Sequence, residues 1–154
     1  MITATAILIL SAALFFFYIQ TLCEKILRRE FSLPYFRDIL NAVDLEFPRV
    51  RQSLSAHAPL EYSQIRLALK CDFLTLTYLV KNGNPTRRRF SWQEKILVAY
   101  FRAILFWLPL RYAFHFRERE SVAKLTAILH YFANLAGERV SPLSAIGAAP
   151  THLS

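Results

Sequence analysis

The pattern of apolar and charged positions divides the chain at Glu24. Residues 1–23 are mostly apolar and contain no charged side chain, whereas charged residues recur regularly from Glu24 onward. At roughly 1.5 Å per helical residue, such a run spans the roughly 30 Å hydrocarbon core of a bilayer. The pattern therefore predicts a transmembrane anchor over residues 1–23, followed by a charged domain.

A cleaved secretory signal and a lipoprotein signal are the alternatives to an anchor. A secretory signal begins with basic residues, and residues 1–5 contain neither Lys nor Arg. A lipoprotein signal would modify Cys23, but Leu22 stands directly before it, where such a site requires a small residue. An uncleaved anchor is therefore favoured over both.

Basic residues follow the anchor and none precedes it. Lys25, Arg28 and Arg29 lie within two helical turns of its end. Because cytoplasmic flanks carry an excess of such residues, we expect a single-pass protein of the cell (inner) membrane, with its N-terminus outside and its C-terminal domain in the cytoplasm. The small residues of the anchor do not recur at a spacing of four, so homodimerisation through the anchor is not indicated.

Beyond the anchor, apolar residues at spacings of three and four predict an all-α protein. We expect a juxtamembrane extension and linker over 24–33, a small cytoplasmic bundle of about four or five helices over 34–140, and a flexible or partner-ordered tail over 141–154. The helices expected within the bundle are 34–47, ended by Pro48, then about 59–82, 91–110 and 121–138.

Two of these helices have recognisable start signals, and one has an unusual apolar pattern. Ser91 and Glu94 match the capping box, and Ser121 is in place to cap the last helix. The segment 59–82 carries two neighbouring apolar stripes rather than one. Such a broad apolar surface indicates a helix at the centre of the bundle.

The run 96–110 is the second most apolar part of the chain, and three placements remain open for it. Arg102 lies in its middle and Pro109 near its end. Its apolar length of about fifteen residues is short for a crossing helix. We therefore favour a core helix over an interfacial one, and an interfacial helix over a second membrane crossing.

Composition and charge narrow the class of partner. The chain has 154 residues, 55% of them hydrophobic, which is enough for one packed domain, and only three are Gly. The net charge of +8 arises entirely after the anchor. A basic domain beside a membrane attracts anionic lipid head groups or acidic proteins. Nucleic acid is disfavoured, because no helix-turn-helix, RNA-binding sheet or zinc finger is recognisable.

The sequence contains no catalytic motif, so we expect a protein that is not an enzyme. Cys23 and Cys71 have no short spacing that would indicate a zinc site. His115 and His130 are candidate haem ligands, but neither is paired with a second ligand by spacing. Asp72, within an apolar helix, is expected to form an ion pair with a neighbouring Arg or Lys. No catalytic residue, cofactor site or metal site is predicted.

The expected function is that of an accessory, structural or assembly subunit of a larger membrane protein complex, of which a bioenergetic complex is one example. The alternatives are a membrane-tethered adaptor or regulator that binds acidic proteins or anionic lipids, and a haem- or metal-binding membrane protein. The residues expected to contact a partner or lipid are basic or aromatic and are Arg28, Arg29, Arg87, Arg88, Arg89, Phe15, Phe16, Phe17 and Tyr18.

Overall fold

The computed structural model describes residues 1–29, 36–59, 61–83, 89–115 and 117–147, without the side chains of 36, 38 and 141–147. These ranges contain six helices and no strand, so the all-helical class predicted from the sequence is confirmed for them. The helices are α1 (Ile2–Leu27), α2 (Phe36–Ala42), α3 (Phe47–Ser55), α4 (Tyr62–Asn82), α5 (Trp92–Ala113) and α6 (Glu118–Gly147).

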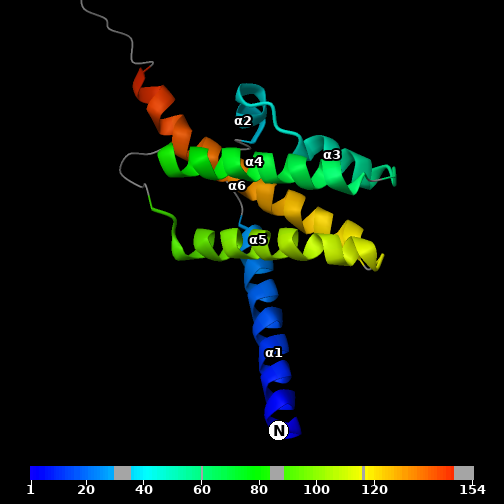
Figure 1. Ribbon diagram of the computed structural model, residues 1–154. Helices are drawn as coiled ribbons and strands as arrows, with labels where there is room; N and C mark the ends of the chain where they lie inside the picture. Colours follow the sequence, from blue (N-terminus) through cyan, green and yellow to red (C-terminus); the bar gives the residue numbers. More distant parts are fainter. Residues whose placement is uncertain (30–35, 60, 84–88, 116, 148–154) are drawn as a thin grey trace, which may run out of the picture.

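The first helix projects from a small helical domain. Figure 1 shows α1 standing below the other helices, with α5 lying crosswise at its upper end and α4 and α6 above α5. Every residue from 1 to 18 is exposed, whereas Cys23 and Ile26 are buried. Only the last turns of α1 therefore pack into the domain, where they contact α5 and α6.

The centre of the domain is α6, which contacts each of the other five helices. Its apolar side chains are almost completely buried, as their helical spacing in the sequence predicts. The buried apolar residues of α6 are Val122, Leu125, Ile128, Leu129, Tyr131, Phe132, Ala133, Leu135 and Ala136.

The expectation that the segment 59–82 forms the central helix is wrong. α4 buries only one of its two stripes, against α6, α3 and α5. The buried stripe includes Leu69, Phe73, Leu76 and Val80. The other helices all lie on one side of α4, so its second apolar stripe faces outward.

Pro48 begins a helix and does not end one. α2 stops at Ala42, and α3 starts at Phe47 with Pro48 in its first turn. Proline is tolerated at this position because the first amides of a helix have no intrahelical partner to lose. The helix expected over 34–47 therefore ends early, at Ala42, and a second short helix follows from Phe47 to Ser55.

α6 begins earlier and ends later than its sequence pattern indicates. It starts at Glu118, so Ser121 lies inside the helix and does not cap it. The Ser121 hydroxyl instead accepts a 2.6 Å hydrogen bond from Arg111 Nη1 and donates to the carbonyl of Arg117. The helix continues to Gly147, past the end expected near residue 138. The tail predicted over 141–154 thus lies partly in α6, and its residues from 148 lie outside the described part of the chain.

The start of α5 agrees with the prediction in detail. The Ser91 hydroxyl accepts from the Glu94 amide at 3.3 Å, and Glu94 Oε2 accepts from the Ser91 amide at 2.9 Å. Both halves of the capping box are therefore formed, which fixes the direction in which α5 leaves the preceding loop.

Candidate docking surface

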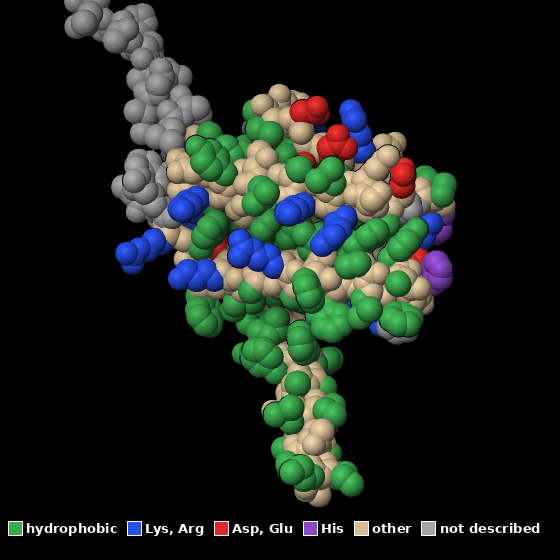
Figure 2. Space-filling model, in the orientation of Figure 1, with side chains coloured by type: hydrophobic (Ala, Val, Ile, Leu, Met, Phe, Trp, Pro, Cys, Tyr) green, Lys and Arg blue, Asp and Glu red, His purple; other side chains and the backbone are tan. Residues whose placement is uncertain are grey.

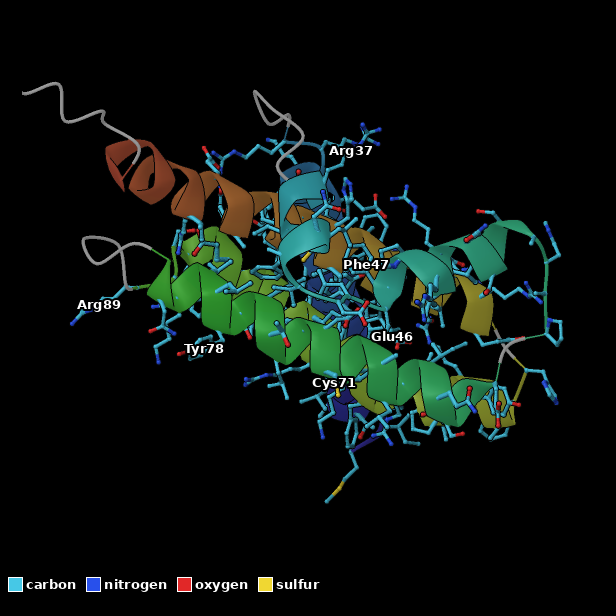
Figure 3. The ribbon with its side chains drawn as sticks, turned by 90° about the horizontal axis from the view of Figure 1, so that it is seen from above. Arg37, Glu46, Phe47, Cys71, Tyr78 and Arg89 are labelled. Carbon is cyan, nitrogen blue, oxygen red and sulfur yellow. The ribbon has the colours of Figure 1, made fainter. Side chains whose placement is uncertain are left out.

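An apolar stripe runs along the outer side of α4. Leu67, Cys71, Leu74 and Tyr78 follow one another at spacings of four, three and four, which places them on one side of the helix. The exposed fractions of Leu67, Leu74 and Tyr78 are 64%, 55% and 67%. Figure 3 shows Cys71 and Tyr78 on the side of α4 away from α6. We call these four residues the α4 stripe.

Positive charges gather beside this stripe, where α4 and α5 meet. The two helices are joined by stacked ring pairs, Phe73 with Phe101 at 4.0 Å and Tyr62 with Tyr112 at 4.8 Å between centroids. Figure 2 shows Lys and Arg side chains over α4 and α5 on this face. The exposed basic residues of α4 and α5, here named the basic seam, are Arg66, Lys70, Lys81, Lys95 and Arg102.

No member of the basic seam forms an ion pair within the described ranges. The ion pairs found there join other cations to Glu94, Glu120 and Glu138. An uncompensated group of like charges attracts anionic ligands, and neighbouring members repel one another until such a ligand binds. The seam and the α4 stripe together therefore suit a partner that is both apolar and acidic.

A buried ion pair fixes α4 and α5 relative to each other. Arg139 of α6 donates at 2.6 Å to Glu94 Oε1, and its other terminal nitrogen donates at 2.8 Å to the Val80 carbonyl of α4. The Arg139 and Glu94 side chains are only 7% and 6% exposed. Because Glu94 also caps α5, a single network joins the end of α4, the start of α5 and the middle of α6.

Asp72 has a different partner from the one predicted. Its Oδ2 atom accepts hydrogen bonds from the backbone amides of Glu46 and Phe47, at 2.9 and 2.6 Å, and not from an Arg or Lys side chain. Figure 3 shows Glu46 and Phe47 where α3 begins beside α4. Burial raises the pKa of the Asp72 carboxyl, and the two amide hydrogen bonds partly oppose that shift. Asp72 thus caps α3 and holds it on α4.

The aromatic contact residues expected on α1 are all exposed. Phe15, Phe16, Phe17 and Tyr18 lie in the projecting part of the helix, with exposed fractions of at least 60%. Phe16 also lines a shallow groove between α1 and α5. These side chains are therefore accessible to lipid or to a partner, and their contact with either stays a prediction.

The basic contact residues expected from the sequence are dispersed. Arg28 is exposed at the end of α1, but Arg29 forms a 3.6 Å ion pair with Glu138 of α6. Arg89 is exposed just before α5, and Arg87 and Arg88 lie outside the described residues.

The sequence pattern does not predict the basic seam, although the second apolar stripe of α4 is visible in it. By itself that stripe indicates burial. Its neighbours Lys70 and Lys81 were the available signal that it faces outward.

α5 also exposes apolar side chains, contrary to the expectation of a core helix over 96–110. Leu97, Phe101 and Leu108 are buried on one side, whereas Phe106 and Trp107 are exposed on another. Within the described residues, α1 and α5 are the two helices long and apolar enough to cross a bilayer, judged by length and composition alone.

The candidate haem ligands have different surroundings. His115 follows the end of α5, where its ring lies 6.1 Å from that of Tyr112. His130 is half-buried in α6, and burial, with a smaller effect of Arg51, lowers its pKa. Throughout the described ranges, no three His, Cys, Asp or Glu side chains lie close enough together to hold a metal ion.

Comparisons with family models, with curated proteins and with solved structures each found no match to this chain. The docking surface itself is thus the basis for a proposed function.

Proposed function

We propose that this protein is a single-pass, membrane-anchored accessory subunit, structural or in assembly, of a larger membrane protein complex. α1 is the anchor, and the domain lies on the cytoplasmic side of the membrane. The α4 stripe and the members of the basic seam that lie on α4, Arg66, Lys70 and Lys81, bind the host complex. The observation that carries this proposal is the α4 stripe, a second apolar side on a helix whose first apolar side already fills the core.

Exposed apolar stripes of this kind favour association with another protein. Full burial of a Leu side chain contributes about 1.5–3 kcal/mol, so Leu67 and Leu74 together would make a substantial contribution to binding. The adjacent cations select a partner that carries carboxylates, because opposite charges guide encounter and fix the register of an interface. An apolar helix with acidic flanks, presented by the host, meets both requirements.

The exposure of α1 supports its role as the anchor. Residues 1–18 are exposed and uncharged, and they include ten Ile, Leu, Phe or Tyr side chains that are at least 60% exposed: Ile2, Ile7, Leu8, Ile9, Leu10, Leu14, Phe15, Phe16, Phe17 and Tyr18. The hydrocarbon core of a bilayer can cover such a surface, so no partner protein is needed to shield it from water. Lys25, Arg28 and Arg29 follow the apolar run and orient the domain towards the cytoplasm.

We assign a single crossing because α5 is part of the domain. It packs against α4 and α6 and lies across the direction of α1 (Figure 1). A second crossing by α5 would separate it from these partners and place Arg102 in the hydrocarbon core, which is costly.

The basic seam also supports a second candidate, a membrane-tethered adaptor that binds acidic proteins reversibly. The two candidates differ in the strength and salt dependence of binding. A subunit held mainly by the α4 stripe stays bound at high salt, whereas an adaptor held mainly by the seam dissociates, because screening weakens exposed charge pairs.

The test is purification of tagged full-length chain from native membranes in mild detergent, comparing wild type with Leu74→Glu and with Ala127→Glu. Ala127 is exposed on α6, where it lines a groove beside α3, and its substitution adds the same carboxylate. We expect wild type and Ala127→Glu to retain one set of membrane proteins in fixed stoichiometry at high salt. Leu74→Glu should lose that set by about tenfold or more, since burying an unpaired carboxylate costs more than about 1.4 kcal/mol.

Helical circular dichroism and melting temperature verify that each variant is folded. Equal retention of the set by folded Leu74→Glu would contradict the proposal. Loss of the set from wild type at high salt would favour the adaptor.

A further inference from the structure

α5 has an outer apolar side whose members are exposed, except Ile96 and Ala103, which are half-buried. Its members follow one another at spacings of three and four, opposite the buried residues Leu97 and Phe101. They are Trp92, Ile96, Ala99, Ala103, Phe106 and Leu110. Trp92 and Phe106 are 76% and 74% exposed, and no charged residue interrupts the series. We call this series the outer side of α5.

The outer side of α5 is continuous with the exposed surface of α1. Phe16 and Gln20 of α1 share a groove with Ala103 and Trp107 of α5. Figure 2 shows hydrophobic side chains covering the underside of the domain around the point at which α1 leaves it. Whatever covers the apolar surface of α1 therefore reaches the outer side of α5 as well.

The level at which α5 lies beside α1 can be compared with the position of the first charged residue of α1. The part of α1 beside α5 runs from Phe16 and Gln20, which share a groove with α5, to Cys23 and Glu24, which lie near Tyr100. Glu24 is the first charged residue of the chain, and the distance from Phe16 to Glu24 along a helix is about 12 Å. α5 thus lies level with the last turns of the uncharged run and reaches its end. Helices that lie in a membrane interface are buried to a similar depth, about 5–10 Å.

Two cations mark one edge of the outer side. Lys95 and Arg102 are two helical turns apart on the same flank of α5, are exposed, and form no ion pair with a described residue. Long basic side chains on an interfacial helix extend to the lipid phosphates while their methylene groups stay in the apolar layer. Trp92 and Trp107 are of the residue type that concentrates at this depth.

We propose that α5 lies flat in the cytoplasmic interface of the membrane, with its outer side against the acyl chains and with Lys95 and Arg102 at the level of anionic phosphates. This placement rests on the proposed function, since it requires α1 to be the anchor. A lipid surface is the occupant that accounts at once for the continuous apolar surface, the depth of α5 and the unpaired cations at its edge.

The chain carries its own probes for this placement, because Trp92 and Trp107, its two tryptophans, both lie on or beside the outer side. The full-length chain is reconstituted into phosphatidylcholine vesicles whose acyl chains are brominated. We expect it to lose most of the tryptophan emission seen in unbrominated vesicles, while acrylamide in the water quenches little. The variants Trp92→Phe and Trp107→Phe should each retain a quenched signal, which shows that both ends of α5 are at this depth.

Strong quenching by acrylamide with no effect of bromine would overturn the placement, because the outer side would then face water. Flotation of the same vesicles separates this failure from failure of the anchor. A chain that floats but is not quenched by bromine retains the anchor and loses the α5 placement. A chain that does not float overturns both.

The contact with phosphates has its own matched pair of variants. In vesicles that contain phosphatidylglycerol, we expect the bromine quenching to exceed that in phosphatidylcholine alone. Lys95→Ser with Arg102→Ser should abolish this increase, whereas Lys70→Ser with Lys81→Ser on α4 should preserve it. Equal behaviour of the two double variants would contradict the assigned role of Lys95 and Arg102.

Discussion

Asp72 determines where α3 begins, although α3 starts more than twenty residues earlier in the chain. Its carboxylate supplies the acceptor that the first amides of α3 would otherwise lack. Caps are recognised in a sequence by residues directly before a helix, and Glu46 makes no side-chain cap there. For this reason the start of α3 cannot be predicted from the residues around it, and the prediction that Pro48 ends a helix is wrong.

At the scale of this residue, we expect Asp72→Ala to lower the free energy of unfolding by about 1–3 kcal/mol, because the part-buried amide of Glu46 and the buried amide of Phe47 lose their acceptor. Asp72→Asn should cost less, since its amide oxygen still accepts. Both changes are measured by thermal unfolding of the full-length chain in detergent.

Asp72 also predicts a pH dependence of stability. Burial raises its folded-state pKa above the ordinary 3.8, so the folded state takes up the proton first as the pH falls. The unfolding free energy of wild type should therefore rise relative to that of Asp72→Asn as the pH is lowered from neutral through the folded-state pKa, and the difference should level off below 3.8. Glu61→Gln, at an exposed acid that does not contribute to the Asp72 shift, is the control. Parallel curves for wild type and Asp72→Asn would refute the raised pKa.

At the scale of the helices, the sequence predicted the elements whose signals are local. The charge-free run of α1 and the capping box of α5 both depend on residues within the element itself, and both helices were placed well. The start of α6 was predicted wrongly, because Ser121 does not cap this helix: its hydroxyl accepts a hydrogen bond from Arg111 of α5. Which sides of α4 and α5 are buried also depends on the helices that pack against them. An apolar stripe shows that something must cover it, but not whether that is the core, lipid or another protein.

The Glu94 and Arg139 network links three helices, so its loss should destabilise the domain as a whole. We expect Arg139→Met to lower the free energy of unfolding by about 3–5 kcal/mol, because it leaves the buried Glu94 carboxylate without an opposite charge. Glu94→Met should have a similar cost. The double variant should lose less than the sum of the two, since no unpaired charge then remains. The measurement is unfolding in detergent.

Lys124→Met is the control for this cycle, because it removes a more exposed ion pair with Glu120 and should cost less than about 1 kcal/mol. Strict additivity of the Glu94 and Arg139 substitutions would show that the two side chains are not coupled.

At the scale of the whole molecule, the exposed apolar surface separates into two parts. α1 and the outer side of α5 form one continuous surface, while the α4 stripe lies on α4, with the basic seam at the junction of the two helices. The excess positive charge therefore lies between a surface assigned to lipid and a surface assigned to a host protein. The sequence indicated both kinds of partner, but it placed the cations in the segment 87–89 and around Arg28, since only the folded chain brings α4 beside α5.

The most direct test of the proposed docking is the rate at which Cys71 reacts with a membrane-impermeant maleimide. Cys71 is exposed in the middle of the α4 stripe, and Cys23→Ser removes the other thiol of the chain. We predict no labelling in intact cells, slow labelling in permeabilised cells where the host covers the stripe, and fast labelling of chain purified free of the host. Labelling in intact cells would contradict the cytoplasmic orientation, and equally fast labelling in permeabilised cells and in purified chain would contradict docking through α4.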